Sequence, residues 1–330
     1  MTLPVNAQTL LEAFSSKTVL IIGDVMIDAY LWGKVDRISP EAPIPVVSVT
    51  HRENRLGGAA NVALNISELG AVPILCSVVG TDEKGNIFSQ LLKQNNLNDA
   101  GIIYDSSRKT TVKSRVISNN QHLLRVDDEV SNPISDSITE ALFARVQKIV
   151  AEYKPNAIIF EDYDKGVITP SLIAKVTQLA EENNIITAVD PKKRNFDKYY
   201  NVTLFKPNFK EFCDGLKCNI EKSDFDSIRQ YAIKFMQAHQ IRIIFITLSE
   251  LGVFIGDGQN FYHIEAEHRD ISDVSGAGDT VISTATLCLA SGLDIYNTAK
   301  ISNLAGGIVC ERSGVVPISK SALLDEISNA

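Results

Sequence analysis

The sequence predicts an α/β fold in which helices cover a mainly parallel sheet, with a small separate β-sheet as a lid. Short apolar runs rich in β-branched residues alternate with stretches of helical spacing along the 330-residue chain. Two further stretches, 29–52 and 102–127, have strand-like sequences with no helix between their strands. Since no repeat, low-complexity tract or linker divides the chain, we expect one domain over residues 1–330.

The strands of the main sheet are predicted where short apolar runs are bounded by polar or turn residues. They are Val19–Ile22, Pro73–Val79, Ala157–Phe160, Thr187–Val189 and Ile243–Ile246. The helices are predicted where apolar residues recur three or four positions apart. They are Ala60–Leu69, Ile87–Asn95, Ser135–Tyr153, Pro170–Glu182, Phe225–His239, Thr280–Ala290 and Ile295–Val309. Thr169 before Pro170 combines a cap residue with proline at the first helical position.

The lid strands follow one another without helices. In the first segment, the proline-interrupted stretch Pro40–Pro45 leads into the strand-like run Val46–Thr50. In the second segment, Thr110–Ile117 and Leu123–Val126 are the strand candidates. Because these runs are β-rich and have no helices to cover the main sheet, we expect them to form a small sheet that projects from the main body.

Composition and charge limit the class of protein. Hydrophobic residues make up 45% of the chain and charged residues 22%, which excludes general disorder. A net charge of −8 argues against a nucleic-acid partner but allows a local basic pocket for a small phosphate. No apolar run reaches the roughly 18 residues of a membrane span, and Met1–Lys17 lacks signal-peptide features. Five cysteines without a C-x-x-C pair indicate reduced thiols. We therefore expect a cytoplasmic protein without a membrane partner.

The segment Asp273–Thr280 is the most informative for function. Gly276 and Gly278 precede a predicted helix, so backbone N–H groups can face outward at the positive end of the helix dipole. Such a turn can bind a phosphate or the charge of a transition state, and Asp279 could take a proton from a hydroxyl that attacks the phosphate. The alternative is a tight turn in which Asp279 caps the helix. No G-K-[ST] follows, which excludes a Walker P-loop, and the missing G-x-G-x-x-G argues against a dinucleotide site.

Two other segments carry polar residues where a ligand could lie. Gly57-Gly58 allows close approach to the backbone, and Asn61 could hydrogen-bond a polyol. Asp24 and Asp28 follow the first predicted strand, and ligands of open α/β sheets collect at the carboxyl ends of strands. The alternatives are a loop-to-helix junction for the first segment and a solvated acidic turn for the second.

These segments resemble the signatures of the ribokinase-type (PfkB) carbohydrate kinase family over essentially the whole chain. A closer resemblance, to the kinase half of the bifunctional bacterial heptose enzymes, lies in seven segments. They are Gly23–Asp28, Arg37–Val47, Gly57–Asn61, Asp162–Gly166, Asp190–Lys192, Lys206–Asn208 with Glu211, and Thr247–Gly252. The resemblance implies a ribokinase-like three-layer α/β/α sandwich. It also implies ATP-dependent phosphorylation of D-glycero-β-D-manno-heptose 7-phosphate at the anomeric O1, for ADP-heptose and lipopolysaccharide core synthesis. Because the chain ends at Ala330, we expect a stand-alone kinase without the nucleotidyltransferase half.

The resemblance also implies a role for individual residues. Asp279 would be the catalytic base, and the amides of Gly276, Ala277 and Gly278 would form the anion hole. Sugar hydroxyls would be held by Asp24, Asp28, Gly57, Gly58 and Asn61. Cations for the 7-phosphate would come from Lys165, Lys192, Arg115 and Arg125. Asn208 and Glu211 would lie near the ATP phosphates and Mg²⁺, Thr247 and Gly252 near the nucleotide, and Asn303 near the adenine. Asp273 and Ser275 match a position that can help to bind a monovalent cation such as K⁺, although Cys310–Gly314 departs from the expected pattern.

Other hypotheses stay open beside this one. One is another sugar or nucleoside kinase of the same family, and the other is a sugar-binding regulator without catalytic activity. The Lys165 and Lys192 pair argues against an unphosphorylated substrate, and the intact Asp279 argues against a regulator. We also expect a homodimer in which the lids pair and close the sugar sites, covering apolar side chains such as Ile44, Val46 and Val116.

Overall fold

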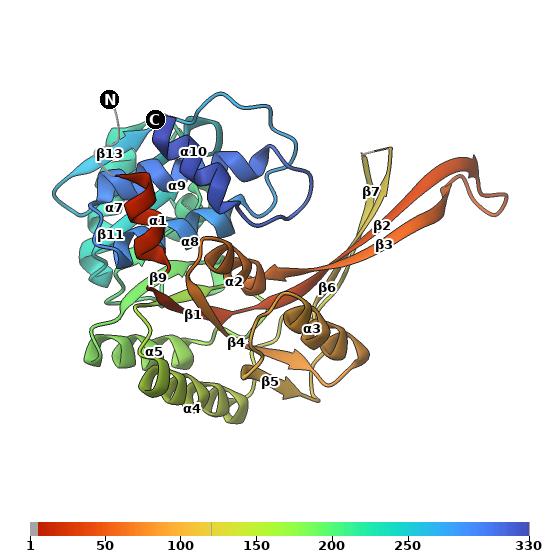
Figure 1. The fold of residues 1–330 in the computed structure, drawn as a ribbon, viewed down its shortest axis with the longest axis horizontal. Coiled ribbons are helices and arrows are strands. Elements are labelled where there is room, and N and C mark those ends of the chain that lie inside the picture. Colours follow the sequence, from red (N-terminus) through yellow and green to blue (C-terminus); the bar gives the residue numbers. More distant parts are fainter. Residues whose placement is uncertain (1–5, 120, 330) are drawn as a thin grey trace.

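The computed structural model describes residues 6–119 and 121–329, and its largest element is a nine-stranded sheet (Figure 1). The strand order is β13-β12-β11-β10-β9-β8-β1-β4-β5. The strands are β1 (Thr18–Gly23), β4 (Val72–Gly80), β5 (Gly101–Asp105), β8 (Ala157–Glu161), β9 (Ile186–Asp190), β10 (Leu204–Phe205), β11 (Ile243–Thr247), β12 (Val253–Gly256) and β13 (Phe261–Ile264). All pairings are parallel except those of β12 with β11 and β13, so the predicted mainly parallel sheet is confirmed.

Helices cover both faces of this sheet, because its buried strands are apolar on both sides. In β1, Val19 and Ile21 pack into one core, whereas Leu20 and Ile22 pack into the other. The first core is covered by α1 (Ala7–Phe14), α2 (Ala59–Glu68), α3 (Glu83–Gln94), α8 (Ala277–Ala290), α9 (Ile295–Cys310) and α10 (Lys320–Asn329). The second is covered by α4 (Asp136–Tyr153), α5 (Pro170–Glu182), α6 (Phe209–Leu216) and α7 (Phe225–His239). The predicted three-layer sandwich is therefore confirmed.

Helix starts follow local capping chemistry. The Thr169 hydroxyl accepts a hydrogen bond from the backbone N–H of Leu172, with Pro170 at the first position, as predicted for α5. Helices α1, α6 and α10, which have 8 to 10 residues, were not predicted from the sequence. The short 3₁₀ helices Lys193–Asn195 and Ser249–Leu251 complete the helical elements described.

A second sheet of four strands, in the order β3-β2-β6-β7, projects from the main body (Figure 1). It consists of β2 (Val25–Ile38), β3 (Pro45–Gly58), β6 (Val112–Ser118) and β7 (Gln121–Asp128). The second lid segment was predicted as 102–127. Its first residues instead belong to β5, Gly101–Asp105, at the edge of the main sheet, so the part of this segment in the small sheet begins only at Val112. In the first segment, β2 already starts at Val25, so Asp28 lies in the small sheet and not in the turn after β1.

The two sheets meet at the carboxyl edge of the parallel strands. In register, Gly23 at the end of β1 is paired with Glu161 at the end of β8, and Glu161 is paired with Asp190 at the end of β9. Only Asp24 separates β1 from β2, and β3 leads directly into α2. The small sheet therefore rises from the edge at which ligands of open α/β sheets bind. Residues 1–5, part of the segment expected to lack signal-peptide features, lie outside the described residues.

Candidate active site

The turn before α8 has the geometry of an anion-binding site. Gly276 is the N-cap of α8 with a φ of +83°, a conformation that favours glycine, and it makes no side-chain cap bond. A Cβ at Gly278 would lie 3.7 Å from both Asp190 Oδ2 and Lys206 Nζ. The first turn of α8 therefore directs its N–H groups and the positive end of its dipole toward a charged, glycine-lined space.

Asp279 is buried in this first turn, where both of its carboxylate oxygens accept hydrogen bonds. Asn61 Nδ2 donates to Oδ2 over 2.6 Å, and the Tyr163 hydroxyl donates to Oδ1 over 2.7 Å. Burial raises the pKa of Asp279 to about 6, although these two hydrogen bonds lower it. Since Gly276 is the cap residue, the alternative in which Asp279 only caps the helix is wrong. A carboxylate with a pKa near 6 can act as a general base near neutral pH.

Asn61, Asp28 and Gly57 were singled out from the sequence, and of these Asn61 contacts Asp279. Asn61 comes from the start of α2, while Asp28 on β2 lies against Gly57 on β3. A Cβ at Gly57 would be 2.2 Å from Asp28 Oδ2, so glycine is needed for the carboxylate to lie there. Asp28 forms an ion pair with Arg115 on β6. Gly58, with a φ of +61°, makes the turn from β3 into α2. This polar wall suits a polyhydroxylated ligand.

Asp24 has a different role from the one predicted. It is buried, and its carboxylate accepts the backbone N–H groups of Tyr163 (2.9 Å), Lys165 (3.0 Å) and Val167 (2.9 Å). These contacts use both oxygens, so Asp24 fixes the loop after β8 instead of facing a ligand. The fixed loop in turn positions the Tyr163 hydroxyl on Asp279. Burial and the nearby Asp279 carboxylate raise the pKa of Tyr163 well above its ordinary value, which keeps the hydroxyl protonated as a donor.

Glu161, Asp190 and Lys206 form a buried charged cluster beneath the turn before α8, and no role was assigned to them from the sequence. Lys206 Nζ lies 2.8 Å from Asp190 Oδ2, and neither oxygen of the fully buried Glu161 has a hydrogen-bond partner within the described residues. Burial, and then the charges of Asp190 and Asp279, raise the pKa of Glu161 well above its ordinary value. Their position in the sequence could have indicated a role, because Glu161 and Asp190 end apolar strands and Lys206 directly follows one.

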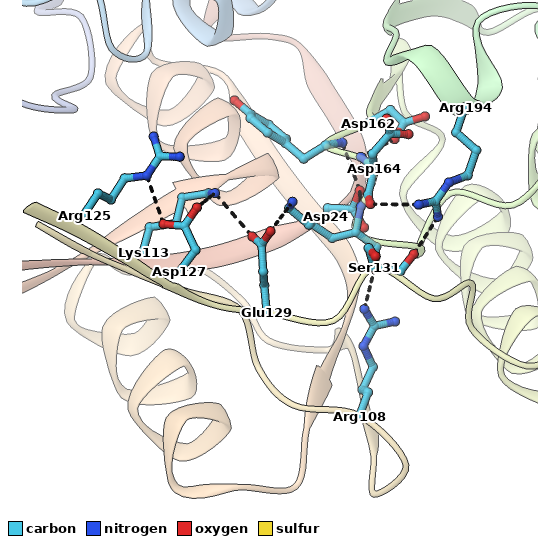
Figure 2. A network of polar contacts seen from close by, with 12 residues as sticks. Asp24, Arg108, Lys113, Arg125, Asp127, Glu129, Ser131, Asp162, Asp164 and Arg194 are labelled. Atoms are coloured by element: carbon cyan, nitrogen blue, oxygen red, sulfur yellow. Dashed lines mark hydrogen bonds and ion pairs between the residues drawn. The ribbon is translucent and has the colours of Figure 1, made fainter.

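The predicted phosphate-binding cations do not converge on one point. Lys192 contacts Glu211 at the start of α6 and lies 3.7 Å from Asp190. Burial lowers the pKa of Lys192, but the carboxylates of Asp190 and Glu211 raise it by more, so it ends above its ordinary value. Arg125 is exposed on β7 and pairs with Asp127 over 3.0 Å. Lys165 pairs with Glu129 over 2.7 Å (Figure 2). The ion pairs thus place Lys192 beside Glu211, whereas Lys165 pairs with Glu129; Lys192 Nζ also lies 5.5 Å from the centre of the Tyr163 ring.

A cleft of about 790 Å³ opens beside the anion hole, a volume in the range of small-molecule sites. Ala277 and Gly278 are among the residues that line it, together with three residues predicted to lie near the nucleotide: Thr247, Gly252 and Asn303. Asn303 Nδ2 donates to the Glu265 carbonyl oxygen over 2.8 Å. Asn208 and Glu211 form a capping box at the start of α6, and Asn208 is bridged to Thr247. The cleft therefore joins the predicted nucleotide residues to the anion hole.

A model of the pfkB family of carbohydrate kinases matches residues 16–321 of the chain. The chain belongs to this family. Two curated relatives, each called bifunctional protein HldE, are similar to this pfkB-family protein. That of Trichlorobacter lovleyi is 36% identical over 323 residues, and that of Helicobacter hepaticus is 38% identical over 317 residues. The alignments cover 97% and 96% of the chain but 65% of each relative, so the chain spans about two thirds of their length.

Solved structures share the fold of the pfkB-family chain. Phosphofructokinase-2 from Escherichia coli in complex with potassium superposes with a TM-score of 0.77 at 18% identity, covering 95% of this chain and 98% of the other. Ribokinase from Arabidopsis thaliana complexed with ribose and ATP superposes with a TM-score of 0.70 at 14% identity, covering 93% and 98%. The predicted ribokinase-like fold is therefore confirmed.

Asp273 and Ser275, the predicted cation residues of this pfkB-family protein, lie in the loop before α8. Asp273 Oδ1 accepts the backbone N–H of Ser275 over 2.9 Å, and Oδ2 accepts that of Gly314 over 3.0 Å. Burial raises the pKa of Asp273, but these hydrogen bonds lower it by a larger amount. The pKa therefore lies below its ordinary value. The carboxylate thus joins the loop to the stretch 310–314, and a K⁺ site here stays a prediction.

In residues 6–119 and 121–329, no group of three or more His, Cys, Asp or Glu side chains is arranged to hold a metal ion. None of the helices in this part of the chain is long and apolar enough to cross a membrane.

Proposed function

We propose that this pfkB-family protein transfers the γ-phosphoryl group of ATP to the anomeric O1 of D-glycero-β-D-manno-heptose 7-phosphate. The product would be the heptose 1,7-bisphosphate used for ADP-heptose and lipopolysaccharide core synthesis. The observation that carries the proposal is the pair of hydrogen bonds that hold both oxygens of Asp279, from Asn61 and Tyr163, in a helix turn whose residues Ala277 and Gly278 line the cleft. The similarity to relatives called bifunctional protein HldE supports the heptose acceptor.

The arrangement supplies a complete phosphoryl transfer. Asp279 takes the proton from the acceptor hydroxyl as its oxygen forms a bond to the γ-phosphorus, and the bond between this phosphorus and the bridging oxygen breaks, which releases ADP. The amides of Gly276, Ala277 and Gly278 stabilise the charge on the transferred group, helped by the α8 dipole. Lys206, buried 2.8 Å from Asp190 beneath Gly278, offsets the negative charge of that carboxylate below the turn.

Residues suited to Mg²⁺ lie beside the anion hole. Asp190 Oδ1 is buried and has no hydrogen-bond partner in the described residues, and Glu211 Oε2 accepts the backbone N–H of Asn208. Carboxylate oxygens and phosphates are the ligands that Mg²⁺ prefers, usually with several waters. Asp190 and Glu211 would therefore hold the ion together with the ATP phosphates, where its charge would offset theirs.

Release of ADP by purified protein, measured over a panel of acceptors, tests the proposed function. The panel pairs heptose 7-phosphate with heptose, fructose 6-phosphate with fructose, and adds ribose and adenosine. We expect the highest kcat/KM with heptose 7-phosphate. Faster turnover of another acceptor would identify a different kinase of the family, and ADP release from none would leave a sugar-binding protein without catalytic activity.

The pH dependence of kcat/KM should follow the ionisation of Asp279. The base must be deprotonated, and its pKa is raised to about 6, so kcat/KM should fall about tenfold per pH unit below that value. Asn61→Ala removes a hydrogen bond that lowers this pKa, so it should move the acidic limb to higher pH. Profiles from pH 5 to 9 check both statements. A wild-type profile that stays flat down to pH 5 would contradict the assignment of the base.

Lys192→Ala should raise the KM for ATP more than the KM for the acceptor. The reason is its contact with Glu211, which lies in the capping box beside Thr247 of the nucleotide cleft. Loss of one charge-assisted contact should cost about tenfold in the affected KM. Lys198→Ala, which removes an exposed lysine paired with Asp197, is the matched control. A larger change in the KM for the acceptor would contradict this prediction. It would support the role first predicted from the sequence, in which Lys192 binds the phosphate of the sugar.

We also propose a homodimer formed through the small sheets. Leu31, Val116 and Leu124 are aligned across β2, β6 and β7, so they share one face of the sheet, and Leu124 is 58% exposed. Covering this face with a second copy would remove apolar surface and protect the sheet edges. Light scattering at micromolar concentration should give twice the 36.1 kDa chain mass, and Leu124→Arg should give a monomer. An active wild-type monomer would contradict the proposal.

A further inference from the structure

Two lysines from different parts of the chain, Lys113 and Lys165, share the carboxylate of Glu129. Figure 2 labels Lys113 and Glu129. Lys165 Nζ lies 2.7 Å from Glu129 Oε1, and Lys113 Nζ lies 3.3 Å from Glu129 Oε2. Lys113 is on β6, Glu129 follows β7, and Lys165 is in the loop after β8. The lysine side chains are only 15% and 16% exposed, while that of Glu129 is 25% exposed. Lys113 Nζ also pairs with Asp127 Oδ2 over 3.2 Å. Among the described residues, Glu129 is therefore the ion-pair partner of Lys165 and one of two partners of Lys113, and it is itself partly open to solvent.

Lys113, Glu129 and Lys165 lie next to the polar wall that contains Asp28 and Gly57. Lys113 is paired in register with Asp28, the carboxylate that lies against Gly57. Lys165 is two residues beyond Tyr163, whose hydroxyl donates to Asp279, and the backbone N–H groups of both residues donate to Asp24 Oδ2. One rigid loop thus joins the catalytic base to the lysine cluster, so the distance between them is fixed by the fold.

Further positive charge surrounds the cluster although the whole chain carries a net charge of −8. Arg108 Nη2 donates to the Lys165 carbonyl oxygen over 2.6 Å, and Arg194 Nη1 donates to that of Ser131 over 2.6 Å (Figure 2). Neither arginine is within ion-pair distance of a carboxylate of the described residues. Asp24 and Asp105 offset part of the charge of Arg108, and Asp127 offsets part of that of Lys113. Arg194 contacts carbonyl oxygens, which do not cancel the charge of its guanidinium, so the surroundings can still stabilise an anion with more charge than one carboxylate.

We propose, on the basis of the proposed function, that Lys113 and Lys165 bind the phosphate that the acceptor sugar already carries. In the absence of the acceptor, the Glu129 carboxylate occupies the position of this phosphate. A phosphate monoester offers three oxygen acceptors and close to two negative charges, so it can bind both ammonium groups better than one carboxylate can. Glu129 lies outside the regular strands and helices, in the connection from β7 to α4, where its side chain can turn into solvent. An acceptor without a phosphate would leave Glu129 in place and gain nothing from either lysine.

The same contacts would also suit a structural tie between the small sheet and the main body. The two interpretations predict opposite effects of removing Glu129. Burial raises the pKa of Glu129, but Lys165 and Lys113 lower it to below its ordinary value, so the carboxylate is ionised and competes with a phosphate at neutral pH. Loss of this competitor should strengthen phosphate binding, whereas loss of a tie should weaken it and destabilise the protein.

Calorimetric titration of the full chain with heptose 7-phosphate and with heptose tests the inference. Lys113→Met should raise the Kd for heptose 7-phosphate about ten- to hundredfold and leave the Kd for heptose unchanged. Glu129→Gln should lower the Kd for heptose 7-phosphate a few-fold, again without an effect on heptose. The control is Lys109→Met, because Lys109 is 65% exposed and pairs with Asp128 on the surface nearby. It should change neither Kd.

Two results would overturn the inference. One is an equal effect of Lys113→Met and Lys109→Met on heptose 7-phosphate. The other is a Glu129→Gln variant that binds both ligands more weakly and melts earlier, which would make the cluster a structural tie. Failure of the proposed function is seen separately, in a wild-type protein that neither binds heptose 7-phosphate nor releases ADP with it. The variants are then compared on whichever sugar phosphate of the panel is turned over, and turnover of none overturns both proposals.

Discussion

Asp279→Asn should reduce kcat about 10²- to 10⁴-fold while the fold and ATP binding are retained. The carboxylate is the group placed to accept the proton, and its oxygens are fixed by Asn61 and Tyr163. The amide of asparagine has nearly the same shape but cannot take a proton at neutral pH. Because burial raises the pKa of Asp279, removing its charge should not lower the melting temperature. Single-turnover ADP release, circular dichroism and ATP titration measure the three quantities.

The matched control for this variant is Asp136→Asn. Asp136 is also an acidic residue in the first turn of a helix, α4, but it is exposed. It has the same favourable interaction with a helix dipole, so comparing the two variants separates the loss of the base from a general dipole effect. Near-normal turnover by a folded Asp279→Asn protein would refute the catalytic assignment.

Gly276→Ala should lower kcat about ten- to a hundredfold with a smaller effect on the KM for ATP. The φ of +83° at this position strains any residue with a Cβ, and the added carbon would lie 3.2 Å from Asn61 Nδ2. Both effects act on the anion hole and on the donor that holds Asp279. Removal of a single donor from an anion hole costs about 10² to 10³ in kcat in other enzymes, and a displaced donor should cost less.

Gly292→Ala separates the two effects of this substitution. Gly292 also has a φ of +83°, but a Cβ there would have no atom within 4 Å. It therefore carries the same backbone strain without crowding, and it lies at the far end of α8 from the anion hole. Both variants should lose about 1–2 kcal/mol of stability from the left-handed backbone, whereas only Gly276→Ala should lose turnover. Equal kcat values in the two variants would show that Gly276 has no special role in the transfer.

The sequence by itself determined the layers of the fold and the centre of the site. The strands around Val19–Ile22 and Ala157–Phe160 and the helix at Pro170 were predicted because apolar periodicity and caps are local properties, read within a few residues. The turn at Gly276 and Gly278 was predicted for the same reason. Strand β5 was assigned to the wrong sheet, since strand pairing depends on residues far away in the sequence.

Tertiary structure alone decided the partners of the charged side chains. The sequence placed Asp24 on a sugar, yet three backbone N–H groups from the loop after β8 use its carboxylate. It placed Lys192 on a phosphate, yet Glu211 of α6 lies against it. Nothing in the sequence indicated that Tyr163 would meet Asp279, 116 residues away. The physical reason is that a charged group binds whichever donor or acceptor the fold brings within about 3 Å, and the chain path that sets this distance is fixed by packing of the whole sandwich.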